Sequence, residues 1–273
     1  MKRFYPILSV LVVVAVLAAL AVLYVLRPPA EASGPIEAVP LATIATESAE
    51  TTTTETEPAE ETAADTIIEA AATPAETEAA PAAEETADPE TADSGELTVY
   101  QISSADSQVT FELDEDLRGS RITVVGTTDQ VAGELAVDLT DLSQTQVGVI
   151  QINARTLTTD NGNRNRAMQN EILDTGSYEY ITFVPTVVTG LPLSANTGDA
   201  LTFTIEGNLT IRNVTLPATF TIQAAAVSET QIAGIASAII ARSDYGLTIP
   251  SVPNVANVEE EVELYIDFVA NAT

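Results

Sequence analysis

The side chains that could carry chemistry in this 273-residue chain are carboxylates, tyrosines, arginines and hydroxyls, because the sequence contains no histidine and no cysteine. The chain therefore lacks an imidazole base, a thiolate nucleophile, disulfides and the usual zinc ligands. Paired carboxylates could hydrolyse a glycoside, yet no pair stands out, and the cluster Asp114-Glu115-Asp116 is too compact for a calcium loop. We predict a protein that binds rather than catalyses, without metal or cofactor.

The scarce positive charges that could form a polar binding contact are Arg164, Arg166, Arg212 and Arg242. Arg164 and Arg166 lie where an Asn-rich loop enters a short helix, so either could contact the polar or anionic head group of a ligand. The alternative, which the sequence favours, is that these arginines form ion pairs with nearby carboxylates such as Asp160 and Asp244 and pin their loops.

The net charge of −30 argues against a nucleic-acid partner, because phosphate binding requires clustered lysine and arginine and this chain has 40 Asp+Glu against 10 Lys+Arg. The charge is also unevenly distributed. Residues 31–93 contain 17 acidic residues and no basic one, whereas the chain from residue 96 onward has a net charge of about −16. The sequence must therefore be divided before it is interpreted.

Residues 7–26 form an uncharged apolar run that is long enough to cross a membrane as a helix. Lys2 and Arg3 precede the run and Arg27 follows it, so the bias of positive charge places the N-terminus in the cytoplasm and the rest of the chain outside. We expect residues 1–30 to be a retained single-pass anchor in the cell membrane. The alternative is a signal peptide cleaved after residues 30–32, which would give a secreted or periplasmic protein.

Residues 31–95 consist mainly of alanine, threonine, glutamate and proline. Such a segment has too little large apolar surface to offset its conformational entropy, and its like charges repel. We predict a disordered, extended linker that gives the following domain reach.

Residues 96–273 show the alternation of apolar and polar residues that is typical of half-buried antiparallel strands. Strands are predicted at 97–103, 107–114, 121–127, 130–139, 145–154, 180–189, 200–211, 214–227, 230–241 and 258–270. Long strands with exposed edges would aggregate, so this all-β domain is predicted to be a closed barrel rather than a sandwich. The pattern breaks at 160–173, which predicts a loop and a short helix across one end of the barrel.

Five segments of this domain resemble, in order and at suitable spacing, the motifs of the YceI-like family. They are 100–111 (YQISSADSQVTF), 157–173 (from LTTD to the Leu173 that follows Arg164-Asn165), 180–183 (YITF), 207–217 (GNLTIRNVTLP) and 242–246 (RSDYG). The resemblance covers about 96–270 and implies an extended, lipocalin-like antiparallel β-barrel that binds a long isoprenoid or other lipid chain in a hydrophobic cavity. The family usually has a histidine where this chain has Asp106, so its head-group preference does not transfer.

The apolar phase of each strand gives the candidate cavity lining: Val109, Phe111, Leu135, Ile150, Ile152, Phe183, Phe203, Ile205, Phe220, Ile222, Leu264 and Ile266. Considered from the residues alone, these side chains would fill an ordinary core, and only the resemblance favours a cavity. A shift of one residue in strand phase would move every one of them to the outer face. Small residues at 224–226 and 234–238 also leave space inside.

The function we expect is non-enzymatic binding, sequestration or transport of an isoprenoid or other amphiphilic lipid outside the cytoplasm. The partners are therefore the lipid ligand and, through the N-terminal helix, the membrane. The oligomeric state is left open, with a homodimer among the arrangements considered. The alternative function is a structural or adhesive surface β module whose core is filled.

Overall fold

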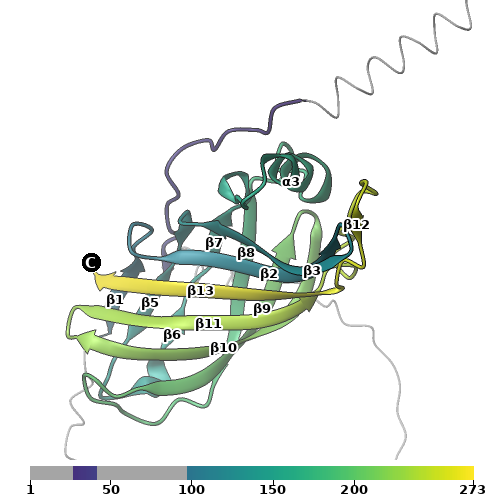
Figure 1. Cartoon of the computed structure of the whole chain (residues 1–273). Coiled ribbons are helices and arrows are strands. Elements are labelled where there is room, and N and C mark those ends of the chain that lie inside the picture. Colours follow the sequence, from purple (N-terminus) through teal and green to yellow (C-terminus); the bar gives the residue numbers. More distant parts are fainter. Residues whose placement is uncertain (1–26, 42–96) are drawn as a thin grey trace, which may run out of the picture.

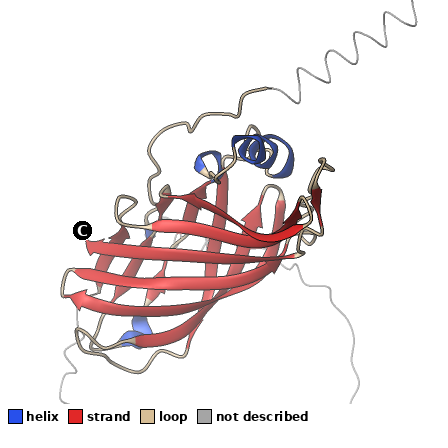
Figure 2. Cartoon of the chain, in the orientation of Figure 1, coloured by secondary structure: helices blue, strands red, loops and turns tan. Residues whose placement is uncertain are grey.

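The computed structural model describes residues 27–41 and 97–273, in which a single antiparallel sheet of thirteen strands curls into a barrel-like shape (Figures 1 and 2). The strands are β1 (Thr98–Ile102), β2 (Gln108–Leu117), β3 (Ser120–Thr128), β4 (Val131–Ala132), β5 (Glu134–Val137), β6 (Gln146–Val147), β7 (Ile150–Asn153), β8 (Tyr180–Thr189), β9 (Leu201–Ile211), β10 (Val214–Ser228), β11 (Gln231–Ala241), β12 (Val255–Ala256) and β13 (Glu261–Ala272). The predicted all-β, antiparallel architecture is confirmed, but the predicted closure of the barrel is not, because the hydrogen-bonded strand order begins at β4 and ends at β6 and these two strands do not pair. Two predicted strands, 130–139 and 145–154, are each divided in two, and β12 is an addition.

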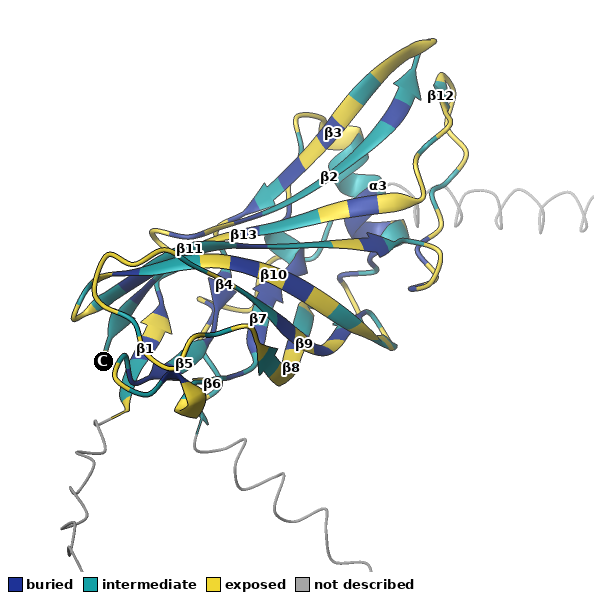
Figure 3. Cartoon of the chain, turned by 90° about the horizontal axis from the view of Figure 1, so that it is seen from below, coloured by how far each residue is buried: buried dark blue, intermediate teal, exposed yellow. Residues whose placement is uncertain are grey.

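Alternation in the sequence becomes alternation of burial in the sheet (Figure 3). In β9, alternate residues are buried, namely Ile205, Gly207, Leu209 and Ile211, whereas the residues between them are exposed or half-buried. The pairing of β9 with β10 sets Ile205 opposite Phe220, another buried residue. Antiparallel sheets with one covered face show this pattern, because successive side chains point to opposite faces.

The sheet curls so that β4, at one end of its strand order, is next along the chain to β5, the strand that pairs with β6 at the other end. Its strand order is β4-β7-β8-β9-β10-β11-β13-β1-β5-β6, and only Gly133 separates β4 from β5. The backbone N–H of Gly148, between β6 and β7, donates a hydrogen bond of 2.8 Å to the carbonyl of Glu134. Strands β2 and β3 form a hairpin that is attached along β13.

One end of the curled sheet, here called the lid end, carries the helical cover. It comprises the helix α3 (Gly162–Ala167) with its continuation Met168–Ile172, the β2–β3 and β9–β10 turns, and the loop 245–258. In Figure 1, α3 and β12 lie on the side away from the C-terminus. The opposite end comprises the loops 138–145 and 190–200 and the β10–β11 turn.

The short helix begins earlier than its apolar residues indicate. The side chain of Asn161 accepts hydrogen bonds from the backbone N–H groups of Asn163 and Arg164, at 2.9 and 3.2 Å, and so caps the helix at Gly162. The Asn-rich residues that suggest a loop are therefore the first turn of α3. Directly after α3, the helix continues as a wider, π-helical turn over Met168–Ile172.

Residues 27–41 lie along the domain and are here called the strap (Figure 1). At the strap's first residue, the guanidinium and carbonyl of Arg27 exchange hydrogen bonds with Asn170, at 3.2 and 2.8 Å. Ile36 is buried, and the backbone N–H of Leu41 donates to the Glu134 carboxylate at 3.0 Å. The structure thus describes residues 31–41 of the predicted linker in contact with the domain.

The remaining predictions for the N-terminal part concern residues 1–26 and 42–96, which lie outside the described residues. None of the helices in 27–41 and 97–273 is long and apolar enough to cross a membrane. The membrane anchor and the rest of the linker stay predictions.

Glu179 is the main attachment point of the strap. Its carboxylate accepts hydrogen bonds from the backbone N–H and the hydroxyl of Ser33, at 2.7 and 2.5 Å, and from Asn153 at 3.0 Å. It also forms an ion pair with Arg155 at 2.8 Å. Burial raises the pKa of this carboxyl group, but the hydrogen bonds and the arginine together outweigh burial and hold the pKa below its ordinary value.

We expect the strap to detach in acid. A carboxyl group whose pKa is lowered in the folded state stabilises that state above its unfolded pKa, and the contribution is lost as the pH falls through the lowered value. Hydrogen exchange of residues 31–41, corrected for the intrinsic pH effect, should be slow near neutral pH and accelerate below about pH 4. Glu179→Gln should accelerate exchange at neutral pH, and protection that persists in acid would contradict this prediction.

Candidate functional site

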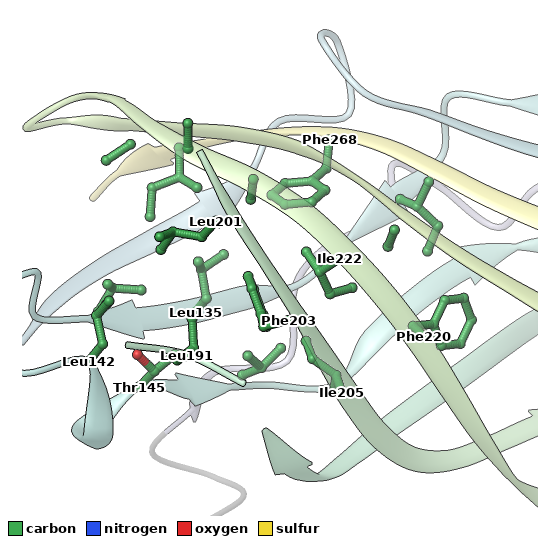
Figure 4. A pocket seen from close by; sticks show the side chains of 18 of the residues that line it. Leu135, Leu142, Thr145, Leu191, Leu201, Phe203, Ile205, Phe220, Ile222 and Phe268 are labelled. Carbon is green, nitrogen blue, oxygen red and sulfur yellow. The ribbon is translucent and has the colours of Figure 1, made fainter. Parts of the chain in front are cut away.

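The curled sheet encloses two apolar cavities. The rear cavity lies toward the opposite end, has a volume of about 130 Å³ and is lined by side chains that are all apolar except Thr145 (Figure 4). Leu135, Leu201 and Phe268 are among its walls, and Ala224, Ala225 and Ala226 leave part of its space open. The Oγ1 atom of Thr145 is buried and has no hydrogen-bond partner within the described part of the chain. A cavity with such a lining favours an apolar occupant.

The front cavity lies under the lid end and is larger, at about 540 Å³. Its walls come from the inward face of β2, from β8, β9 and β13, and from the residues Ala167, Met168, Ile172 and Leu173 of the lid. Its rim is polar and contains Glu115, Arg118, Asn161, Asn163, Arg164, Arg242 and Asn254. The site therefore combines an apolar interior with polar groups at one end only, which suits an amphiphile.

An aromatic pair lies between the two cavities. Phe183 on β8 and Phe220 on β10 line both of them and meet edge to face, with ring centroids 4.8 Å apart and planes at 63°. Gly207 on the intervening strand makes room for the ring of Phe183, because a Cβ at this position would lie 2.6 Å from Cζ of that ring. We call this pair the aromatic divide.

The structure places all twelve predicted cavity residues on a cavity wall, so the strand phase inferred from alternation holds at each position. Leu135, Ile150, Phe203, Ile205 and Ile222 line the rear cavity, Val109, Phe111, Ile152 and Leu264 line the front cavity, and Phe183, Phe220 and Ile266 line both. Contact of these side chains with a ligand stays a prediction.

The small residues of β11 have mixed roles. Ala236 lines the rear cavity, but Gly234 does not line either one. A Cβ at Gly234 would lie 2.4 Å from the carbonyl oxygen of Gln223 on β10, so the glycine permits close approach of two strands rather than opening space.

The two candidate head-group arginines are placed differently. Arg164 lies on the front cavity rim, where its guanidinium pairs with the buried Glu115 at 3.0 Å and with the exposed Asp160. Arg166 lines neither cavity, and its Nε is buried without a hydrogen-bond partner in the described residues. Arg164 therefore ties α3 to β2, which is the loop-pinning role that the sequence favours.

The other two arginines also fasten the lid end. Arg242 pairs with Glu260 at 3.0 Å, not with its sequence neighbour Asp244, and donates to the carbonyls of Glu259 and Leu247. Arg212, in the β9–β10 turn, donates to the carbonyl of Ile172 at 3.3 Å and lies 5.9 Å from the centroid of the Tyr178 ring. Both side chains hold loops in place.

Sequence reasoning missed Arg118 and Glu115 as rim residues. Arg118 lies in the β2–β3 turn with a positive φ of 53°, borders the front cavity and forms no ion pair within the described residues. Glu115 shares the inward phase of Val109 and Phe111 on β2, a signal that was available in the alternation. Arg118 is the rim cation that is best placed to meet an anionic group.

Two further ionisable residues bear on the site. Asp106, which replaces the family's usual histidine, lines neither cavity and accepts a hydrogen bond of 2.7 Å from the Ser103 hydroxyl in the β1–β2 connection.

Tyr245 is buried beside the lid, where burial and the nearby charge of Asp244 raise its pKa, so its phenol stays neutral. Within 27–41 and 97–273, no three acidic side chains gather where they could hold a metal ion.

Comparisons with known proteins agree with this fold. The family model described as the YceI-like domain matches residues 100–270. A solved structure described as a polyisoprenoid binding domain from Saccharophagus degradans, implicated in plant cell wall breakdown, is 15% identical with a TM-score of 0.53, covering 65% of this chain and 99% of that one. BcnA from Burkholderia cenocepacia is 17% identical with a TM-score of 0.50, covering 62% and 99%. These identities support a common fold alone, and a search of curated proteins finds no match.

Proposed function

Because this chain belongs to the YceI-like family, a binding family, we propose that it binds a long isoprenoid or similar amphiphilic lipid without catalysing a reaction. The observation that carries the proposal is the pair of apolar cavities arranged in line, with polar groups only at the lid end. A lipid chain would occupy the interior and its head group would lie at the front rim.

Burial of the chain would supply most of the affinity. Each CH₂ group transferred from water to an apolar site gains about 0.8 kcal/mol, so a chain of several isoprene units needs few polar contacts. Neither cavity wall offers a network of hydrogen bonds, because the interior is almost wholly aliphatic and aromatic. The chain length and the bulk of the ligand would therefore matter more than its fine chemistry.

The head group would meet the rim arginines. Arg164 and Arg242 already pair with carboxylates, whereas Arg118 has no such partner in the described part of the chain and faces the same cavity. A phosphate or carboxylate head would supply the missing negative charge. The unpaired Arg118 therefore favours an anionic amphiphile over a neutral one as the ligand.

The second candidate function, a structural or adhesive β module, requires a filled core. The two cavities favour the binding function over it. The proposed location follows from the sequence: residues 7–26 anchor the chain in the cell membrane, and the domain works outside the cytoplasm.

The proposal is tested by lipid extraction. The full chain, purified from its native membrane in detergent, is expected to release an isoprenoid-type lipid into organic solvent in near-stoichiometric amount, measured by mass spectrometry. Ala236→Phe places a ring in the rear cavity and should sharply reduce the amount of retained lipid.

The matched control is Ile239→Phe, which adds a ring on the outer face of the same strand, at a residue that is 63% exposed. This variant should retain as much lipid as the unaltered chain. The binding function would be refuted if the unaltered chain and both variants contained the same amount of lipid and this amount did not exceed that found in detergent without protein.

A further inference from the structure

We propose that the lid end is the membrane-facing surface of the domain and that it rests on the bilayer in which residues 7–26 are anchored. This inference depends on the proposed membrane anchoring, but not on which lipid the cavities hold. The partner is a lipid surface with anionic head groups, and three independent observations support the orientation.

The first observation is the position of the strap. Arg27 is the first residue after the apolar run 7–26, and it is already bound to the lid through Asn170 and an ion pair of 3.5 Å with Asp174. One residue spans at most about 3.5 Å, so the chain has no length with which to move the lid away from the end of the run. Anchoring of that run would therefore bring the lid to the membrane surface.

The rest of the strap restrains the domain from swinging. Ser33 is held by Glu179 and Arg155, Ile36 is buried, and Leu41 is held by Glu134. These attachments follow one another along the side of the sheet. A domain held at several successive points keeps one orientation relative to its anchor.

The second observation is the distribution of positive charge. All seven arginines of residues 97–273 lie at the lid end: Arg118 and Arg121 near the β2–β3 turn, Arg155, Arg164 and Arg166 between β7 and β8, Arg212 in the β9–β10 turn, and Arg242 after β11. The opposite end has Asp138, Asp141, Asp199 and Glu229 and no basic residue. The lid end also carries carboxylates, and several of them pair with these arginines. Arg118, however, is exposed and forms no ion pair within the described residues, so the lid end offers a cation to lipid phosphates, whereas the opposite end offers none.

The third observation is the loop 245–258, which contains no charged residue although the domain is acidic. Ile249, Pro250 and Val255 border the front cavity, and Val252 is 42% exposed. Apolar side chains next to a membrane gain free energy by entering the head-group boundary. In this position, the loop would open the front cavity directly to the bilayer, and a lipid could enter without crossing water.

The test uses the absence of tryptophan from this chain. A single tryptophan is introduced by Ser251→Trp, at an exposed position in the loop that does not line a cavity, or by Leu193→Trp, at a residue that is 80% exposed at the opposite end. The full chain is placed in nanodiscs of phosphatidylcholine and phosphatidylglycerol that carry a nitroxide on the head group. We expect quenching of Ser251→Trp to be several-fold stronger than that of Leu193→Trp.

Adding Glu179→Gln to the Ser251→Trp chain weakens the attachment of the strap and should lower its quenching toward that of Leu193→Trp, with circular dichroism confirming that the fold is retained. Equal quenching at the two positions would overturn the orientation, and unchanged quenching after Glu179→Gln would overturn the role of the strap. Strong quenching of Ser251→Trp in a chain that yields no extractable lipid would support the orientation and refute lipid binding. A chain that does not enter nanodiscs would refute the anchor.

Discussion

Replacement of Phe220 by alanine is expected to join the two cavities into one and to lengthen the lipid chain that the protein accepts. Phe220 is 5% exposed and forms the aromatic divide with Phe183. Truncating a buried phenylalanine costs about 3–5 kcal/mol, partly because of the space it leaves. The free energy of unfolding should fall by this amount, and a series of isoprenoid alcohols of increasing length should show its tightest binding at a longer member.

Phe203→Ala is the control for this result. Phe203 is half-buried, lines only the rear cavity and is not part of the aromatic divide. Its truncation should cost less stability and widen the rear cavity without joining it to the front one. If both variants prefer the same chain length, the aromatic divide does not separate two parts of the binding site.

Glu115→Ala should loosen the lid and accelerate lipid exchange. This carboxylate is buried on β2 and holds Arg164 of α3 at 3.0 Å, so its removal leaves a largely covered guanidinium with only the exposed Asp160. Loss of such a partner costs about 1–3 kcal/mol. If this free energy is lost from the lid position seen in the structure and not from a displaced one, exchange of a fluorescent isoprenoid phosphate should accelerate roughly 5- to 150-fold, measured by stopped flow.

Asp160→Ala removes the other carboxylate that contacts Arg164. The side chain of Asp160 is 86% exposed, and exposed ion pairs contribute about 0.2–1 kcal/mol. Its exchange rate should stay close to that of the unaltered chain. Similar acceleration in both variants would show that the buried pair has no special part in closing the lid.

The walls of the site could be predicted from the sequence because strand alternation is a local property. Phe203 and Ile205 share the phase of Leu201 on β9, so all three point to the same face. On the neighbouring strand β10, Phe220 and Ile222 share one phase in the same way. Once one face must be buried, the period of two determines which side chains point inward. The family resemblance then indicated that the inside is partly empty, and this could not be read from phase alone.

The contacts that organise the site could not be predicted in this way. The strap has the alanine- and proline-rich composition of a linker, and its attachment of Ser33 to Glu179 joins residues 146 positions apart. The aromatic divide depends on the relative tilt of two rings on strands that are not adjacent. Arg118 becomes a rim residue only because the β2–β3 turn meets the loop 245–258 at the front cavity, where the backbone N–H of Arg118 donates to the carbonyl of Asn254 at 2.7 Å.

The strap also changes what a cut in the linker would do. Residues 42–96 connect Leu41 to β1 along the chain, and the contacts of the strap are a second link between the domain and the N-terminal segment. A protease that cleaved this stretch would produce two fragments still joined through Ser33, Ile36 and Arg27. If residues 7–26 anchor the chain as proposed, shedding of the domain would then require two events, proteolysis of the linker and release of the strap, and the contact at Glu179 makes the second event easier in acid.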